Sequence, residues 1–238
     1  MKKQFILLFI FFTLIFSCKK DKKVIDDPHQ GTISIAVDES FKSVSEALTE
    51  RYMALNPESK INLIIKKEDL AFLDLLENKV RVIVMSRELS DKEKQGFKNK
   101  IGLEIQPAKF AADAVVFIVP KDSPKQSITM EEIKSELNSD SKKLIFDGTN
   151  ASNLNFVAQE LSTTPNKLKF SIISGNKNII EEMNKYPGKI GVIGLNTISR
   201  PYDKESEDLR NSVKILPVIS HNGSYAPDIE NIKSMKYP

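Results

Sequence analysis

The chain has little of the chemistry on which metal proteins and many enzymes depend. It contains one cysteine, two histidines and no tryptophan. A single cysteine excludes an intrachain disulfide framework and a cysteine-rich zinc site. Two histidines leave almost no basis for a multi-histidine metal centre. We therefore expect neither a metal nor a cofactor.

The chain also lacks an excess of one charge. Lysine and arginine total 35 and aspartate and glutamate total 32, so the formal net charge is +3 at pH 7. A chain so close to balance has no electrostatic footprint for a nucleic-acid partner. Hydrophobic residues make up 40% of the 238 residues. This fraction supports a real core and argues against fully disordered, collagen-like and coiled-coil classes.

Motifs of catalysis are missing as well. The sequence has no Gly-x-Ser-x-Gly elbow, no Walker loop and no Gly-x-Gly-x-x-Gly fingerprint. His29 lies in a charged N-terminal stretch, and His221 precedes Asn222-Gly223, which is typical of a turn. We predict no catalytic residues and no enzyme activity, and these absences disfavour the alternative of a lipid-anchored hydrolase.

The N-terminus has the features of an export signal. Lys2 and Lys3 precede an apolar run over residues 5–16, which is too short to span a bilayer permanently, and Ser17-Cys18 follows. The segment resembles a bacterial lipoprotein signal, in which residues 1–17 are removed and Cys18 carries the lipid. An ordinary cleaved signal with a chance cysteine is the alternative.

Residues 18–31 are charged and contain few apolar side chains. Such a composition cannot bury enough surface to order itself, so we predict a tether between the lipid and the folded domain. Its lysines either lie against anionic headgroups or are simply solvated. The expected location is the cell envelope, lipid-anchored on the periplasmic side or at the cell surface.

Short β-rich runs alternate with helical patterns in the rest of the chain, which predicts an α/β fold with mostly parallel sheets. Strands are expected at residues 32–37, 61–65, 81–85, 114–119, 143–146, 168–173, 189–193 and 213–218. Helices are expected at residues 40–55, 69–78, 133–137, 153–161 and 177–186, with capping boxes at Ser90 and Thr129.

The strand and helix pattern occurs twice, with a join near residues 109–113, so we predict two lobes with a cleft between them. We assign residues 32–110 and 213–238 to the first lobe and residues 111–212 to the second. Ligands of open α/β sheets bind at the carboxyl ends of the strands. These ends carry Ser40, the pair Ser86-Arg87 and the hydroxyl- and amide-rich loop 147–153.

Each of these features alone is weak evidence, because a serine before a helix is usually a cap and an arginine after a strand is usually a solvated surface residue. Their shared position at strand ends of both lobes favours an oxyanion site. Backbone N–H groups with serine and asparagine side chains hold an oxyanion without a formal counter-charge.

Three segments together resemble the periplasmic phosphate-binding proteins of ABC transporters (the PstS-like proteins). They are Glu39-Ser40-Phe41, the loop 147–153, and the glycine-rich segment 188–194. The resemblance spans most of residues 31–200. It implies a two-lobed, type II periplasmic-binding-protein fold and a monomer that captures phosphate or a related oxyanion for an ABC permease.

The resemblance also implies site residues. Ser40 and Phe41 match the donors at the first helix start. The family's Ser-Gly-Thr loop is matched loosely by Ala151-Ser152-Asn153 or, one residue earlier, by Asn150-Ala151-Ser152. The predicted ligand-binding residues are therefore Ser40, Phe41, Ser86, Arg87, Asn150, Ser152 and Asn153.

The chain departs from the family at two charged positions. Arg87 lies near the place of the family's proton-accepting aspartate, and Phe146 near the place of its arginine. We expect Arg87 to supply the only full positive charge, with weak discrimination between phosphate and sulfate unless Asp38 or Asp113 reaches the ligand. The alternative function is a sensing or adhesion lipoprotein with an altered ligand site.

Overall fold

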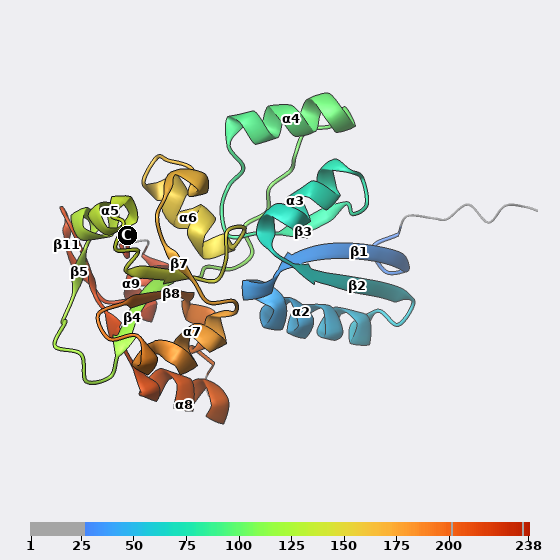
Figure 1. Ribbon diagram of the computed structural model, residues 1–238. Coiled ribbons are helices and arrows are strands. Elements are labelled where there is room, and N and C mark those ends of the chain that lie inside the picture. The colour runs from blue at the N-terminus through green and yellow to red at the C-terminus, as the bar shows by residue number, and fades with distance from the viewer. Residues whose placement is uncertain (1–26, 201, 235) are drawn as a thin grey trace, which may run out of the picture.

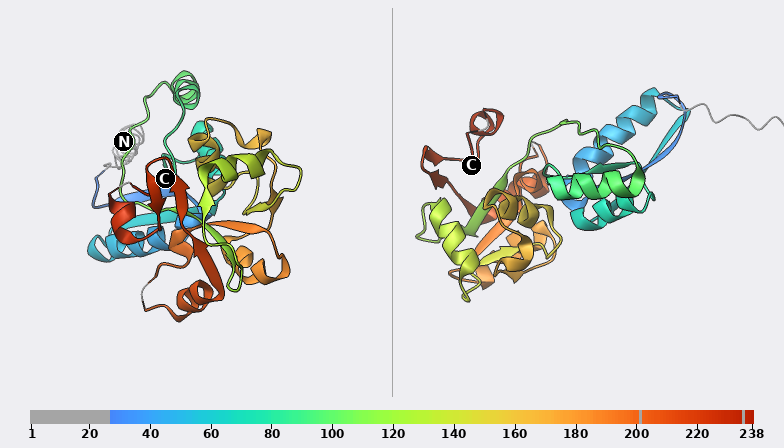
Figure 2. Two further views of the ribbon diagram at one scale, coloured as in Figure 1. Left: turned by 90° about the vertical axis from the view of Figure 1, so that its left-hand side faces the viewer. Right: turned by 90° about the horizontal axis from the view of Figure 1, so that it is seen from above.

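The protein has two lobes that lie side by side (Figures 1 and 2). The computed structural model describes residues 27–200, 202–234 and 236–238. The predicted signal peptide, Cys18 and most of the predicted tether lie outside the described residues. Within those described ranges, none of the helices combines the length and the apolar character needed to cross a membrane.

The first lobe is built on a parallel three-stranded sheet with the order β2-β1-β3. Helix α2 covers one face of this sheet and α3 the other (Figure 1). The elements are β1 (Gly31–Asp38), the 3-10 turn η1 (Glu39–Phe41), α2 (Lys42–Leu55), β2 (Ser59–Lys66), α3 (Glu68–Leu76), β3 (Val82–Val84) and α4 (Asp91–Ile101). Parallel neighbours need a crossover, and the helices supply it.

The core of the first lobe is small. Its fully packed members are Ala36, Ala71, Leu75, Val80 and Phe97. Phe97 comes from α4, which lies above α3 and away from the sheet (Figure 1). The capping box predicted at Ser90 opens this helix and is confirmed.

The second lobe contains a five-stranded mixed sheet with the order β7-β6-β8-β4-β9 and a small sheet with the order β11-β10-β5. Its elements are β4 (Val115–Pro120), β5 (Ile128–Thr129), α5 (Met130–Asn138), β6 (Leu144–Phe146), α6 (Ser152–Glu160), η2 (Pro165–Lys167), β7 (Ser171–Ile172), α7 (Asn176–Glu182), η3 (Met183–Lys185), β8 (Ile190–Gly194), η4 (Leu195–Thr197), α8 (Lys204–Ser212), β9 (Val213–Leu216), β10 (Val218–Ser220), β11 (Gly223–Tyr225) and α9 (Ile229–Lys233).

Strand β4 divides the core of the second lobe into two layers. Phe117 and Val119 pack in a cluster that includes residues of α5 and α6. Val116 and Ile118 point to the opposite face, into a cluster that includes residues of α7. Alternate residues of a strand face opposite sides of its sheet, so an apolar run fills both layers. The buried strand predicted at residues 114–119 is confirmed.

Helix α7 approaches β8 very closely at Gly191. A Cβ atom on this glycine would lie 2.7 Å from Ile179 and 2.8 Å from both Ile118 and Met183. Only a residue without a side chain leaves room for this packing. The close contact between β8 and α7 therefore explains why residue 191 of the glycine-rich segment is a glycine.

The two-lobed α/β fold predicted from the sequence is confirmed. The chain passes from the first sheet to the second through residues 102–114, which contain the predicted join and lack regular helix or strand. In Figure 2 this connecting segment runs along the outside of the molecule from one lobe to the other.

The assignment of residues 213–238 to the first lobe is wrong. Strand β9 pairs antiparallel with β4 and forms an edge of the second lobe's sheet. Near the C-terminus, the hydroxyl of Tyr237 donates to the carbonyl of Val115 over 3.1 Å. These pairings join residues about a hundred positions apart in sequence, which a local strand pattern does not reveal. Pro217 lies between β9 and β10 and separates the two strands.

Candidate functional site

The lobes meet where the turn after β1 faces the start of α6. Ser40 lies in η1 of the first lobe and Ser152 is the first residue of α6 in the second lobe. Their Oγ atoms lie 3.0 Å apart. The structure thus brings together two predicted site residues that are 112 positions apart in sequence.

Asp38, the last residue of β1, lies beneath these two hydroxyls. Its Oδ1 accepts hydrogen bonds from the Ser40 backbone N–H (2.9 Å) and from Ser152 Oγ (2.8 Å). The residue is buried, with 1% of its surface exposed. Its Oδ2 is also buried and has no hydrogen-bond partner among the described residues. Burial raises the pKa of this carboxyl, although the hydrogen bonds from Ser40 and Ser152 oppose the rise.

Arg87, which follows the third strand, is held by two carboxylates of its own lobe. Its Nε donates to Glu68 Oε1 over 3.0 Å, and its two terminal nitrogens donate to the two oxygens of Glu93 over 2.9 Å each. Arginine forms strong bidentate pairs of this kind. The guanidinium is therefore engaged within the protein and is not an unopposed charge.

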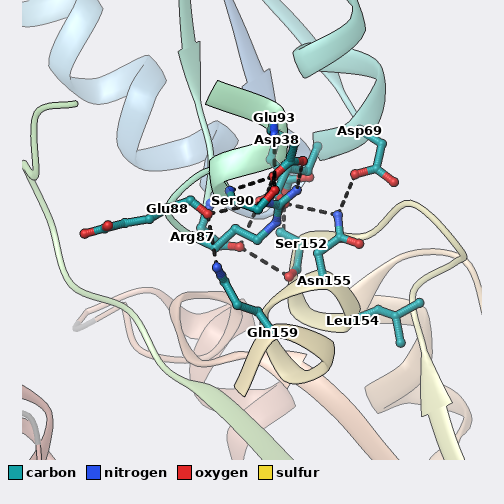
Figure 3. A network of polar contacts seen from close by, with 12 residues as sticks. Asp38, Asp69, Arg87, Glu88, Ser90, Glu93, Ser152, Leu154, Asn155 and Gln159 are labelled. Carbon is teal, nitrogen blue, oxygen red and sulfur yellow. Dashed lines mark hydrogen bonds and ion pairs between the residues drawn. The ribbon is translucent and has the colours of Figure 1, made fainter. Parts of the chain in front are cut away.

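Glu68 organises a polar network whose other members include Arg87 and Asn155, both labelled in Figure 3. It has no exposed surface, and its Oε2 accepts from both the backbone N–H (2.9 Å) and the hydroxyl (2.8 Å) of Ser86. Burial raises its pKa, while Ser86, Arg87 and Asn155 oppose the rise. Because a buried carboxylate is costly without partners, these contacts fix the position of Glu68.

The same network crosses to the second lobe. Asn155 of α6 donates from Nδ2 to Glu68 Oε1 (3.1 Å) and Asp69 Oδ1 (2.7 Å). The hydroxyl of Ser86 also lies 3.2 Å from the carbonyl oxygen of Ser152. The first turn of α6 is thereby held against the strand ends of the first lobe (Figure 3).

A second bridge between the lobes is an ion pair at Lys67. Its Nζ lies 2.8 Å from Glu39 of the first lobe and 2.6 Å from Asp147, which follows β6 in the second lobe. Burial lowers the pKa of Lys67, but the bonds to Asp147 and Glu39 outweigh it, so the net shift is upward. Arg87 and Lys67 thus each face two carboxylates, so neither is an unopposed positive charge between the lobes.

The other predicted residues of the second loop have different surroundings. Asn153 donates from Nδ2 to the carbonyl of Val192 over 2.8 Å, inside its own lobe. Asn150 is partly buried and lies just before α6. Phe41 is the N-cap of α2 and is also partly buried. Ser152 is therefore the member of this loop whose hydroxyl contacts Ser40.

Sequence reasoning missed Lys67, Glu68 and Asp69, which directly follow β2. The predicted first-lobe site residues follow the first and third strands, and none follows the second. The same strand-end rule applies to β2, so a signal was present in the sequence. Asn155 had no comparable signal, because it lies one turn inside α6 and resembles any polar helix residue.

Two α/β lobes whose polar strand ends face each other are the architecture of two-lobed periplasmic binding proteins. The chain belongs to the PBP superfamily, because the model of the PBP superfamily domain matches residues 23–238. The curated relatives are phosphate-binding proteins and not enzymes, which agrees with the sequence prediction.

Individual relatives agree with this assignment. The phosphate-binding protein PstS of Borreliella burgdorferi is 26% identical over 261 residues, covering 100% of this chain and 84% of that protein. An ABC-type phosphate transport receptor from Vibrio cholerae superposes with a TM-score of 0.63 at 14% identity, covering 86% of this chain and 82% of the other. The structure of PstS from Borrelia burgdorferi superposes with a TM-score of 0.52 at 21% identity, covering 87% and 83%. At these identities the two solved structures establish the fold alone.

Proposed function

We propose that the protein captures phosphate or a related oxyanion between its lobes and delivers it to the permease of an ABC transporter. The observation that carries the proposal is the meeting of Ser40 and Ser152, one hydroxyl from each lobe, beside the buried Asp38. The names of the relatives, a phosphate-binding protein and a phosphate transport receptor, support the choice of phosphate.

The donors of this site are neutral. Ser40 and Ser152 each offer a hydroxyl, and the N-terminus of α6 adds backbone N–H groups and the positive end of its dipole. An oxyanion enters when the lobes part enough for the two hydroxyls to turn from each other toward its oxygens. The ligand then replaces a direct contact between the lobes and joins them itself.

Asp38 gives the site a means of choosing phosphate over sulfate. Hydrogen phosphate carries a proton at neutral pH and can donate it to a carboxylate, whereas sulfate has no proton to donate. The Oδ2 of Asp38, which is buried and has no hydrogen-bond partner among the described residues, becomes this acceptor when the lobes part. An ionised Asp38 repels sulfate, because two sets of oxygen lone pairs face each other. The proposal therefore favours phosphate and replaces the expectation of weak discrimination.

Arg87 has a supporting place in this proposal. Its donors hold Glu68 and Glu93, and Glu68 in turn fixes Ser86 at the end of β3. We expect Arg87 to keep this strand end in position and not to supply the charge for the ligand. Direct ligand contacts by Phe41, Asn150 and Asn153 stay predictions.

The proposal includes a lipid anchor at Cys18 and a location in the cell envelope, on the periplasmic side or at the cell surface. Acyl chains contribute about 0.8 kcal/mol for each buried CH₂ group, so several chains on one cysteine anchor a protein firmly. Detergent-phase partitioning tests this part: the wild type should enter the detergent phase, and Cys18→Ala should lose the lipid anchor and leave a soluble or uncleaved precursor. Wild-type protein in the aqueous phase would refute the anchor.

Calorimetric titration with phosphate, with sulfate and with buffer alone tests the proposed ligand. We expect one phosphate per chain and weaker binding of sulfate. Ser152→Ala should weaken phosphate binding about tenfold, because it removes one donor to a charged group. Ser224→Ala, at an exposed position of β11, is the matched control and should leave binding unchanged. Absence of heat with phosphate would reject the proposed ligand.

One observation favours the alternative of a sensing or adhesion lipoprotein with an altered ligand site. The polar groups of one lobe already have partners on the other, as in the contacts of Ser40 with Ser152 and of Asn155 with Glu68. Lobes joined in this way can remain closed with no solute between them. The titration distinguishes the two functions, since the alternative predicts no heat with either anion.

A further inference from the structure

Asn196 connects three parts of the molecule that meet at the base of the interface between the lobes. It lies in η4, directly after β8 of the second lobe. Its backbone N–H donates to Asp113 Oδ1 over 3.0 Å, and its side-chain Nδ2 donates to Asp113 Oδ2 over 2.7 Å. The same Nδ2 donates to the backbone carbonyl of Ser40 over 2.6 Å. The connecting segment, the second lobe and the site turn of the first lobe are thus joined by one side chain.

The orientation of the Asn196 amide follows from the chemistry of its partners. An ionised carboxylate and a backbone carbonyl only accept hydrogen bonds. The amide nitrogen, with its two protons, is therefore the atom that faces Asp113 and Ser40, and the amide oxygen is not. An aspartate at this position would place oxygens against oxygens on both sides.

The carboxylate of Asp113 packs closely against Gly194, next to its contact with Asn196. A Cβ atom on Gly194 would lie 3.2 Å from Asp113 Oδ2, so the absence of a side chain lets the carboxylate approach the end of β8. Asp113 is exposed as a residue, and its carboxylate accepts from the backbone and the side chain of Asn196. Loss of solvent around this carboxylate raises its pKa to about 6, against the opposing hydrogen bonds from Ala114 and Asn196.

We propose that Asn196 is a positioning residue of the oxyanion site. Asp113 orients the Asn196 side chain, and Asn196 holds the Ser40 turn of the first lobe against the second lobe. This inference rests on the proposed function for its effect on ligand affinity. Its effect on contact between the lobes is independent of any ligand. Through the Ser40 carbonyl, the contact fixes the turn that carries the Ser40 hydroxyl and N–H group.

The first test is Asn196→Asp in the full chain, with hydrogen exchange measured by mass spectrometry and phosphate binding by calorimetry. We expect faster exchange at η1 and at residues 194–197, because both acceptors now face a carboxylate. Phosphate affinity should fall about tenfold. Asn222→Asp, in the turn between β10 and β11, adds the same charge elsewhere and should change neither readout. Unchanged exchange at η1 in Asn196→Asp would overturn the proposal.

The exchanged pair Asp113→Asn with Asn196→Asp separates positioning from simple structural support. An asparagine at position 113 can donate to the new carboxylate and accept from its backbone N–H, so the contact at the connecting segment returns. The new carboxylate still has no proton for the Ser40 carbonyl. We expect wild-type exchange at residues 194–197 but fast exchange at η1 and weak phosphate binding. Recovery of slow exchange at η1 would show that Asn196 only supports the fold.

Hydrogen exchange and phosphate affinity together distinguish a failure of the role of Asn196 from a failure of the proposed function. If the wild type binds no phosphate, the proposed ligand fails, and hydrogen exchange at η1 still decides the role of Asn196. If phosphate binds but the variants leave exchange and affinity unchanged, the role of Asn196 fails and the proposed ligand stands.

Discussion

At the scale of single residues, the site depends on how buried carboxylates are satisfied. Asp38 has one oxygen with two donors and one oxygen with none among the described residues. Glu68 has donors on both oxygens, from Ser86, Arg87 and Asn155. A buried acceptor without a partner is costly and marks a place where a ligand proton can be received. The two carboxylates therefore have different roles although both are buried.

Replacement of Asp38 by asparagine tests the acceptor role. Asp38→Asn removes the negative charge and half of the acceptor capacity while keeping the size of the side chain. Phosphate binding should weaken about tenfold or more, while sulfate binding should be unchanged or stronger. Calorimetric competition between the two anions measures the ratio. Asp122→Asn, at an exposed turn, is the charge-matched control. An unchanged ratio in Asp38→Asn would rule out Asp38 as the proton acceptor.

Replacement of Arg87 tests whether this residue supports the fold. Arg87→Met keeps the length of the side chain but leaves Glu68 buried without its cation. Breaking a buried ion pair in this way costs about 3–5 kcal/mol of unfolding free energy. Urea denaturation measures the loss, and adding Glu68→Gln should recover part of it. A loss under about 1 kcal/mol would show that Arg87 behaves like an ordinary surface arginine.

At the scale of secondary structure, the order and type of most elements could be predicted from the sequence. The apolar run of β4 and the capping box at Ser90 are local signals, and both are present. The lobe to which residues 213–238 belong could not be predicted, because it depends on pairing between β9 and the distant β4. For the same reason, sequence identified Ser40 and Ser152 as candidates but not Asn196 or Glu68 as their supports.

The capping box of α4 predicts a pH dependence of stability. Burial alone would raise the pKa of Glu93, but the hydrogen bonds from Arg87 and Ser90 lower it to about 2 from its ordinary value of 4.5. A lowered carboxyl pKa stabilises the folded state above pH 4.5, and this contribution is lost as the pH falls toward 2. The difference in unfolding free energy between wild type and Glu93→Gln should therefore shrink over this range. A difference that is constant with pH would contradict the assignment.

Substitution by alanine should change the unfolding free energy in opposite directions at two glycines. Gly191→Ala places a methyl group within 2.8 Å of α7 and β4 side chains, and such overpacking costs about 1–3 kcal/mol. Gly96 lies in α4 with no atom within 4 Å of a built Cβ, so Gly96→Ala should stabilise by about 0.5–1 kcal/mol. Urea denaturation measures both. Equal effects would mean that the close approach of α7 to β8 is not as described.

At the scale of the whole molecule, the two lobes contact each other through polar groups at the ends of their strands. Lys67 joins Asp147, and Asn155 joins Glu68 and Asp69. A solute that binds between the lobes must compete with such contacts. Molecules whose lobes are closed without solute cannot bind it, so the apparent affinity falls as the fraction of closed molecules rises. Closure and binding are therefore coupled, and the polar residues around the site set the balance.

The position of a bound oxyanion tests this account most directly. Arsenate has the tetrahedral shape and protonation of phosphate, and arsenic gives an anomalous signal in a crystal grown with it. We predict one peak between the lobes, within hydrogen-bond distance of Ser40 Oγ and Ser152 Oγ and beside Asp38. A crystal with no peak between these serines, or with peaks only on exposed lysines, would contradict it.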